Sequence, residues 1–235
     1  MRSIERPAGH PSAARYRVRF SRRGPAAGLT HMAQIERVRR AVVDSGLPAI
    51  LNRQRRTAKP KLAFGPAISL GYESTAEYFD LELAEPLLPT EVATALRAVL
   101  KDGLELNAVR RIPRYFPSLD ASINVARYEI SGPFPRDAGQ SLARFLDRRE
   151  IVIEKVKDAG ARVERIEARR LIVGMKMVGP GLLGLDLRFG PNRTIKPEAL
   201  LREWLGLAEG GGLAGFHILR KELLSETSRG EFLIP

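Results

Sequence analysis

The sequence predicts an α+β protein built from two ferredoxin-like lobes in tandem, each with the element order β-α-β-β-α-β, the second elaborated with extra strands. Apolar residues alternate with arginines near the N-terminus, and this strand pattern is followed by a helical one. Up to residue 112, further strand patterns and a second helix complete the order. After the stretch 113–118, strand and helix patterns begin again.

The spacing of apolar residues changes from every second position in the first predicted strand to every third or fourth position in the first predicted helix. Apolar side chains and arginines occupy opposite faces of the predicted strand: Tyr16, Val18 and Phe20 on one face, Arg15, Arg17 and Arg19 on the other. Gly24-Pro25 ends this strand, and Thr30 is a suitable N-cap for the helix that follows. Apolar residues then recur every three or four positions until Ser45-Gly46, where we expect the helix to end.

The rest of the first lobe follows from shorter patterns. Segments 48–51 and 62–70 are apolar and extended, and between them runs a loop, 53–61, that is too charged to bury. Strand 77–83 alternates, so we expect two faces: Phe79, Leu81 and Leu83 inward, Tyr78, Asp80 and Glu82 outward. Pro89 opens a second helix, and Asp102-Gly103 turns into a strand at 104–112.

These patterns divide the chain into a flexible basic arm at 1–14, an N-terminal domain at 15–112, a linker at 113–118 and a C-terminal domain at 119–235. In the second domain we expect strands at 127–131, 151–157, 162–167, 171–178, 182–189 and 216–223, and helices at 135–147 and from Pro197. Turns at Asp158-Ala159-Gly160 and Gly179-Pro180-Gly181 connect two pairs of these strands.

Composition limits the function. Lys and Arg exceed Asp and Glu by 39 to 27, a net charge of +12 that favours anionic partners, nucleic acid before a membrane surface. The alternative is an ordinary protein from an arginine-rich proteome. The chain has no cysteine, which excludes disulfides, thiolate metal sites and iron–sulfur clusters held by this chain. Since no signal peptide or membrane span is visible, we expect a cytoplasmic protein with no membrane partner.

The sequence resembles the radical SAM-linked protein family, whose members are encoded beside, or fused to, a cobalamin-binding-type radical SAM protein. Four stretches carry the resemblance: Tyr16-Arg17-Val18-Arg19-Phe20-Ser21 through His31, Gly46-Leu47-Pro48, Lys59-Pro60-Lys61-Leu62 through Leu83, and Leu187-Arg188-Phe189-Gly190-Pro191 through Pro197. The family usually has an aromatic residue in the loop before the Lys-Pro-Lys stretch, which is absent from Asn52–Ala58 here. The resemblance implies a radical SAM partner rather than a reaction.

A set of basic residues from the first strand and the following loop is the strongest candidate binding surface. We expect it to contact RNA through Arg17, Arg19, Arg22, Arg23, Arg53, Arg55, Arg56, Lys59 and Lys61. In a ferredoxin-like sheet these side chains could converge at one end and on the open face. The alternative is that Asp80 and Glu82, on the third strand, form ion pairs with Arg17 and Arg19 and neutralise that face.

His31 is the one candidate for catalysis. It would lie in the first turn of a helix, where exposed N–H groups disfavour the imidazolium, so a neutral ring could act as a general acid or base on RNA. The CRISPR-repeat-processing endoribonucleases pair ferredoxin-like domains, and Gly210-Gly211-Gly212-Leu213-Ala214-Gly215-Phe216 is similar to their glycine-rich loop. The other interpretation is that His31 packs against, or caps, the helix start.

The leading hypothesis is a non-catalytic accessory subunit that binds structured RNA, tRNA or rRNA, for modification by a radical SAM protein. In this reading the chain holds no metal or cofactor, and the chemistry belongs to the partner. Two alternatives remain open: a metal-independent RNA-processing endonuclease that uses His31, and a protein-interaction scaffold whose positive charge is incidental.

Overall fold

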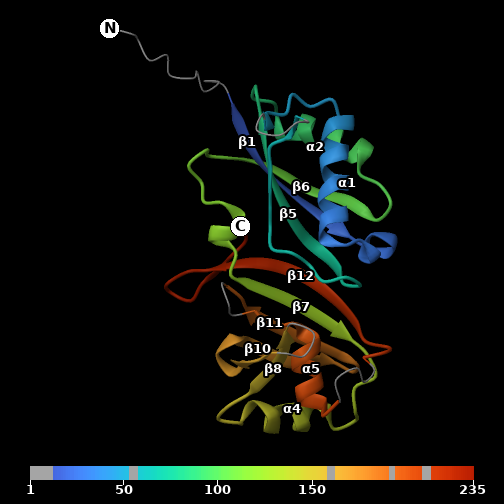
Figure 1. The fold of residues 1–235 in the computed structure, drawn as a ribbon, viewed down its shortest axis with the longest axis vertical. Helices are drawn as coiled ribbons and strands as arrows, with labels where there is room; N and C mark the ends of the chain where they lie inside the picture. Colours follow the sequence, from blue (N-terminus) through green and yellow to red (C-terminus); the bar gives the residue numbers. More distant parts are fainter. Residues whose placement is uncertain (1–12, 53–57, 158–161, 191–193, 208–212) are drawn as a thin grey trace. The chain divides into compact units, whose positions relative to one another are not determined.

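The computed structural model describes residues 13–52, 58–157, 162–190, 194–207 and 213–235 (Figure 1). The chain divides into two compact units: residues 1–70 with 76–121, and residues 71–75 with 122–235. Each unit combines a mostly antiparallel sheet with helices, so the α+β class is confirmed. The predicted arm at 1–14 lies almost wholly outside the described residues. Within the described part, no helix is long and apolar enough to span a bilayer.

The first unit contains the sheet β4-β5-β1-β6 and two main helices. In chain order its elements are β1 (Ala14–Arg22), α1 (His31–Asp44), β2 (Leu51–Asn52), β3 (Lys59–Pro60), β4 (Leu62–Phe64), β5 (Glu73–Leu83), α2 (Pro89–Val99) and β6 (Leu104–Ile112). The pairs β1–β6 and β4–β5 are antiparallel, and β2 pairs with β3 in a separate ribbon. The first residues of β5, 73–75, belong to the second unit.

Local signals account for the ends of these elements. The Thr30 hydroxyl accepts a hydrogen bond from the Ala33 N–H at 3.2 Å, so the predicted N-cap of α1 is confirmed. The turn before β6 has Asp102 and Gly103 in left-handed conformations, with φ of 55° and 86°. A Cβ on Gly103 would lie 2.0 Å from the Arg23 carbonyl oxygen, so only glycine fits at this close approach.

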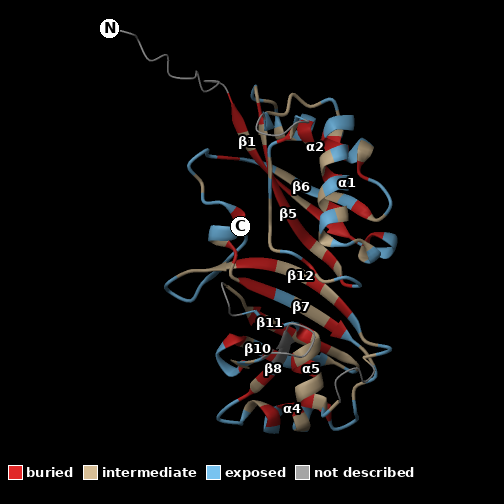
Figure 2. Ribbon diagram, in the orientation of Figure 1, coloured by how far each residue is buried: buried red, intermediate tan, exposed pale blue. Residues whose placement is uncertain are grey.

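Both helices of the first unit pack on one face of its sheet. Buried apolar residues from β1, β5, α1 and α2 form a single core: Tyr16, Val18, Phe20, Phe79, Leu81, Leu83, Val38, Val42, Val92 and Leu96. Figure 2 shows this as mostly buried residues along β1 and β5. The prediction that the apolar faces of β1 and β5 point into the core is therefore confirmed.

The opposite face of the sheet differs from the expectation. Tyr78 and Asp80 were expected to face outward, yet their exposed fractions are only 4% and 3%. The reason for Asp80 is that arginines of β1 bind its carboxylate. The apolar segment 62–70 forms a strand only over β4, because Gly65 and Pro66 follow and proline has no N–H for a ladder.

The second unit contains the sheet β10-β11-β7-β12, and β12 also pairs in parallel with Glu73 and Ser74 of β5. Its elements are α3 (Leu119–Ser122), at the boundary, then β7 (Val125–Ser131), α4 (Ala138–Leu146), β8 (Val152–Lys157), β9 (Arg162–Glu167), β10 (Ile172–Gly179), β11 (Leu182–Arg188), α5 (Pro197–Leu205), β12 (His217–Glu226) and β13 (Phe232–Leu233). Two short 3-10 helices, η1 (Gly24–Gly28) and η3 (Arg169–Leu171), belong to the first and second units respectively.

Several predicted features of the second unit are confirmed. β8 and β9 form an antiparallel hairpin, although its turn, Asp158-Ala159-Gly160, lies outside the described residues. β10 and β11 are antiparallel, and Pro197 occupies the first turn of α5. α4 and α5 are joined by the Trp204 indole N–H, which donates to Ser141 Oγ at 3.2 Å.

Candidate functional site

The arginine face of β1 is largely used inside the first unit. Arg17 is 2% exposed, and its Nε and Nη2 donate to Asp80 Oδ1 and Oδ2 at 2.7 and 2.9 Å. Arg15 Nη2 donates to Asp80 Oδ2 at 2.5 Å. The predicted alternative, a cross-strand ion pair between Arg17 and Asp80, is therefore confirmed. Glu82 pairs instead with Lys61, at 2.8 Å.

Arg22 is also buried rather than presented to solvent. It is fully buried, and it donates to Gln34 Oε1 at 3.0 Å and to the carbonyl oxygens of Ala27 and Leu29 at 2.5 and 2.8 Å. These bonds tie the end of β1 to η1 and to the start of α1. Arg17 and Arg22 were candidate RNA ligands, and the structure places both guanidiniums inside the fold, where other groups of the protein bind them.

The other candidates of the basic set lie nearer the surface. Arg19 is half-buried, with its guanidinium 5.9 Å from the centre of the Tyr78 ring, and Arg23 is exposed at the end of β1. Lys59 Nζ lies 3.0 Å from Glu36 Oε2. Arg53, Arg55 and Arg56 lie outside the described residues.

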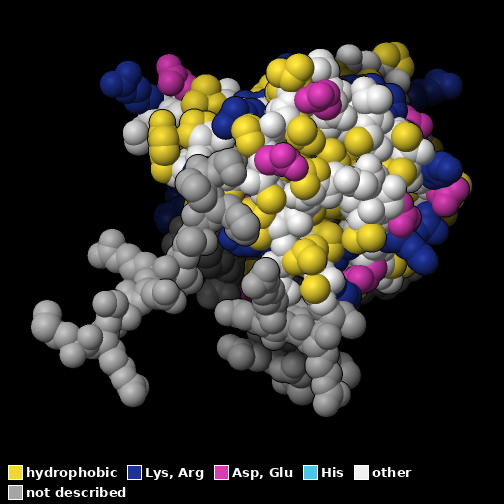
Figure 3. All heavy atoms as spheres, turned by 90° about the horizontal axis from the view of Figure 1, so that it is seen from above, with side chains coloured by type: hydrophobic (Ala, Val, Ile, Leu, Met, Phe, Trp, Pro, Cys, Tyr) yellow, Lys and Arg dark blue, Asp and Glu magenta, His cyan; other side chains and the backbone are white. Residues whose placement is uncertain are grey.

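Charges of both signs are mixed on the surface near these lysines. Hydrogen bonds from Lys59 and then Arg39 lower the pKa of the Glu36 carboxyl, so this acid stays ionised and offsets part of the positive charge. On the face shown in Figure 3, Lys and Arg side chains are scattered among Asp, Glu and hydrophobic ones. Net charge alone therefore does not locate a binding surface.

Segment 113–118, expected to be a linker, packs against the arginine face of the first unit. Arg15 Nη1 donates to the Phe116 carbonyl oxygen at 2.6 Å, and Arg17 Nη2 donates to that of Pro117 at 3.0 Å. The Phe116 ring lies 5.4 Å from the Arg17 guanidinium and 6.0 Å from that of Arg110. The segment thus covers one end of the sheet face.

The same region gathers exposed arginines that the sequence reasoning did not single out. Arg110 and Arg111 lie near the end of β6, and Arg114 follows in the covering segment; all three are exposed. A hollow of about 350 Å³ is lined by Ala14, Arg15, Arg111, Ile112, Pro113 and Arg114. The sequence signal was the run Arg110-Arg111-Ile112-Pro113-Arg114-Tyr115-Phe116, in which three arginines precede two aromatic residues.

His31 is the first residue of α1 and is half-buried. The glycines of the proposed glycine-rich loop, Gly210 to Gly212, lie outside the described residues. His217 is exposed, and its Nε2 lies 3.4 Å from Glu73 Oε2 within the second unit. Among the described residues, no group of three or more His, Cys, Asp or Glu side chains is placed to hold a metal ion.

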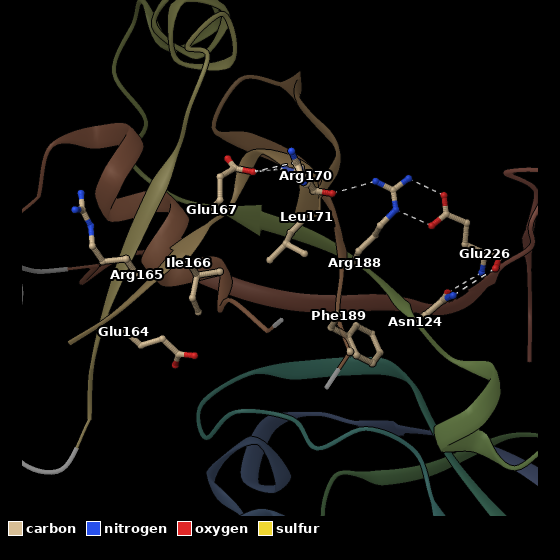
Figure 4. A pocket seen from close by; sticks show the side chains of 11 residues that line it. Asn124, Glu164, Arg165, Ile166, Glu167, Arg170, Leu171, Arg188, Phe189 and Glu226 are labelled. Atoms are coloured by element: carbon tan, nitrogen blue, oxygen red, sulfur yellow. Dashed lines mark hydrogen bonds and ion pairs between the residues drawn. The ribbon is translucent and has the colours of Figure 1, made fainter. Parts of the chain in front are cut away.

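The second unit holds a larger cavity, of about 740 Å³ (Figure 4). It lies between the β9–η3 region and the ends of β11 and β12, and its lining is Asn124, Glu164, Arg165, Ile166, Glu167, Arg170, Leu171, Arg188, Phe189, Gly190 and Glu226. Arg188, Phe189 and Gly190 belong to the stretch 187–197 that carried part of the family resemblance.

An ion pair closes one side of this cavity. Arg188 Nε and Nη2 donate to the two Glu226 oxygens at 2.7 and 2.6 Å, and Arg188 Nη1 donates to the Arg170 carbonyl oxygen at 3.2 Å. The Arg188 hydrogen bonds lower the pKa of Glu226. Asn124 accepts from the Glu226 N–H at 2.7 Å, which fixes the backbone beside the pair. Figure 4 shows this chain of contacts along the cavity wall.

The rest of the lining combines charge with apolar surface. Glu167 accepts a hydrogen bond from the Arg169 N–H at 2.8 Å, so its carboxylate caps the start of η3. Arg170 is 93% exposed and lies 3.9 Å from Glu167. Ile166, Leu171 and Phe189 provide apolar contact. The lining therefore carries three carboxylates and three guanidiniums beside its apolar side chains, with no excess of either charge.

The sequence was compared with protein families and with curated proteins. Residues 15–197 match the family model described as an uncharacterized protein conserved in bacteria, DUF2344. The match includes all four stretches that carried the resemblance, and it spans most of the chain. No curated protein matches the sequence. The chain therefore belongs to the DUF2344 family of uncharacterized proteins conserved in bacteria.

Proposed function

We propose that this chain is a non-catalytic subunit that binds RNA and presents it to a radical SAM protein. The observation that carries the proposal is the group of exposed arginines Arg110, Arg111 and Arg114 beside the covering segment 113–118. Guanidiniums match phosphate geometry and retain their charge at any physiological pH, so such a group suits an RNA backbone. The net charge of +12 supports the same conclusion.

The architecture supports two lobes of the ferredoxin-like class. In the first unit the strands lie side by side in the order β4-β5-β1-β6. If the four strands of this sheet are numbered along the chain, that order is 2-3-1-4. The order β10-β11-β7-β12 of the second unit is the same if the β8–β9 hairpin is counted as an insertion. We therefore propose a tandem duplication of one ferredoxin-like lobe, with the hairpin as the added strands of the second.

The radical SAM partner is proposed from the family resemblance and from chemistry. Radical SAM reactions need an iron–sulfur cluster, whose usual ligands are cysteine thiolates, and this chain has no cysteine. The partner would hold the cluster and perform the reaction, while this subunit selects and orients the RNA. Cytoplasmic tRNA or rRNA is the proposed substrate.

Affinity purification of the tagged protein from its own cells, with sequencing of bound RNA and identification of bound proteins, tests this proposal. We expect a defined RNA, a radical SAM protein and a colourless, iron-free subunit. Recovery of proteins without RNA would favour the scaffold hypothesis. Stoichiometric iron on the isolated chain, or cleavage of S-adenosylmethionine by it alone, would contradict a non-catalytic role.

The salt dependence of RNA binding tests the loop 53–61. Each phosphate contact contributes about −0.7 for single strands, or about −0.9 for duplexes, to the slope of log affinity against log salt. If Arg53, Arg55, Arg56 and Lys59 contact the backbone, replacing all four by alanine should flatten the slope by about 2 to 4. The matched control, Arg37→Ala with Arg40→Ala on exposed positions of α1, should change it less.

A further inference from the structure

The covering segment of the first unit begins with a turn that presents an aromatic side chain to solvent. The Phe116 N–H donates to the Pro113 carbonyl oxygen at 3.0 Å, which closes a four-residue turn with Arg114 and Tyr115 at its tip. Tyr115 is 90% exposed. A single exposed apolar residue is common on protein surfaces, so exposure alone indicates nothing. What distinguishes Tyr115 is how its backbone is held and what surrounds it.

Three carbonyl groups of the segment are bound by arginines of β1. Arg15 donates to the carbonyl oxygens of Phe116 and Arg114, at 2.6 and 3.4 Å, and Arg17 donates to that of Pro117, at 3.0 Å. Because Arg15 and Arg17 are themselves fixed by Asp80, the turn is anchored to the ion pair beneath it. An aromatic ring on an anchored turn loses little conformational entropy when it binds a ligand.

Tyr115 follows Arg114, one of the residues that line the hollow after β6. Arg111 and Arg114 are exposed and both line this hollow, and within the described residues neither guanidinium is in an ion pair. Three of the six residues that line the hollow are arginines, and none of those six is acidic. An anion is therefore the ligand that this hollow would attract.

We propose that the turn is a binding site for single-stranded RNA, in which Tyr115 stacks on an unpaired base while Arg111 and Arg114 contact the neighbouring phosphates. An exposed ring beside arginines is the arrangement that binds unpaired nucleotides, because every base has a face that can stack. Bases in a duplex are already stacked and cannot reach such a ring. This inference rests on the proposed RNA-binding function and gives that function a site in the first unit.

The test measures binding of a short fluorescent oligouridine and of a blunt-ended RNA duplex without a loop to the full chain, across a salt series. Tyr115→Ala should weaken binding of the oligouridine by about 5- to 150-fold, without a change of salt slope. Tyr115→Phe keeps the stacking face and should bind as the unmodified protein does. Arg111→Ala with Arg114→Ala should flatten the slope by about 1.4, two phosphates at about 0.7 each.

Two matched controls separate the site from general surface effects. Leu88→Ala removes another large apolar side chain, 65% exposed, and Arg40→Ala removes an exposed arginine from α1. Both should leave affinity within twofold of the unmodified protein, about 0.4 kcal/mol. Unchanged thermal melting of the Tyr115 variants would show that they are folded.

The outcomes distinguish the site from the function. If the unmodified protein binds the oligouridine but Tyr115→Ala binds it equally well, the site is wrong and RNA binding stands. The same holds if Tyr115→Ala weakens binding of the duplex and of the oligouridine to the same extent. If neither RNA binds even at low salt and none co-purifies from cells, the proposed function fails, and the site with it. If Tyr115→Ala releases a protein partner and leaves RNA affinity unchanged, the turn is a protein-docking element, which overturns the inference.

Discussion

Arg17 of β1 and Asp80 of β5 form a two-point ion pair, with Nε–Oδ1 at 2.7 Å and Nη2–Oδ2 at 2.9 Å and exposed fractions of 2% and 3%. The same Arg17 guanidinium donates to the Pro117 carbonyl oxygen, so one side chain joins two strands and the covering segment. The charges on this face therefore organise the first unit, whereas Arg110, Arg111 and Arg114 stay exposed.

Removing the charge of Asp80 should strongly destabilise the first unit. Asp80→Asn leaves two arginine guanidiniums, one of them buried, without a carboxylate, and breaking a buried pair from one side typically costs about 3–5 kcal/mol. Urea unfolding followed by circular dichroism measures the loss.

The matched control for Asp80 is Asp186→Asn. Asp186 pairs with Arg127 at 2.8 Å, but that arginine side chain is 48% exposed, so the change should cost less than about 1 kcal/mol. Equal losses for the two variants would mean that burial adds nothing to the Arg17–Asp80 pair.

Arg22 and Arg23 are neighbours that should respond differently to the same substitution. Arg22→Lys keeps the charge but loses the planar fork that reaches Gln34 and two carbonyl oxygens, so we expect a loss of about 1–3 kcal/mol. Arg23→Lys, at an exposed position, should change stability by less than about 0.5 kcal/mol. Thermal melting of the two variants side by side measures the difference, and similar melting temperatures would contradict a structural role for Arg22.

Signals within a few residues predicted the local structure well. The Thr30 N-cap, the first-turn Pro197 and the turn between β10 and β11 were all read from short patterns, because caps and turns depend on the residues that form them. The hairpin β8–β9 was predicted for the same reason.

The alternation of apolar and polar residues could not predict contacts between residues that are far apart in the sequence. Arg17 and Arg19 have the same position in the alternation, yet only Arg17 meets Asp80, 63 residues further on. The segment 113–118 has the composition of a linker, and nothing local indicates that Arg15, about a hundred residues earlier, would bind its carbonyl groups. The cavity of the second unit likewise depends on Asn124 and Glu226, 102 positions apart.

The Arg188–Glu226 pair should make stability depend on pH in the acid range. Hydrogen bonds from Arg188 lower the pKa of Glu226 below its ordinary 4.5, so the ionised form is favoured in the folded state. The stabilisation is complete above the ordinary pKa and is lost as the pH falls through the lowered one, while Arg188 stays charged.

Glu226→Gln removes this titration. We therefore expect the variant to be less stable than the unmodified protein at pH 7, with the difference shrinking as the pH falls below about 4. Urea midpoints measured from pH 7 downward test this. A difference that stays constant with pH would show that the pair acts through packing alone.

His31 decides between the accessory subunit and the nuclease. It begins α1 and is half-buried, so we expect His31→Ala to lower stability by no more than about 2 kcal/mol. Labelled RNA should remain intact when it is incubated, in the presence of a metal chelator, with the unmodified protein or with His31→Ala. The reason is that the proposed subunit performs no chemistry on RNA. His217→Ala, an exposed histidine paired with Glu73, is the matched control. Cleavage by the unmodified protein that persists in His217→Ala and disappears in His31→Ala would establish the nuclease and overturn the non-catalytic proposal, whereas cleavage unaffected by either change would point to a contaminating ribonuclease.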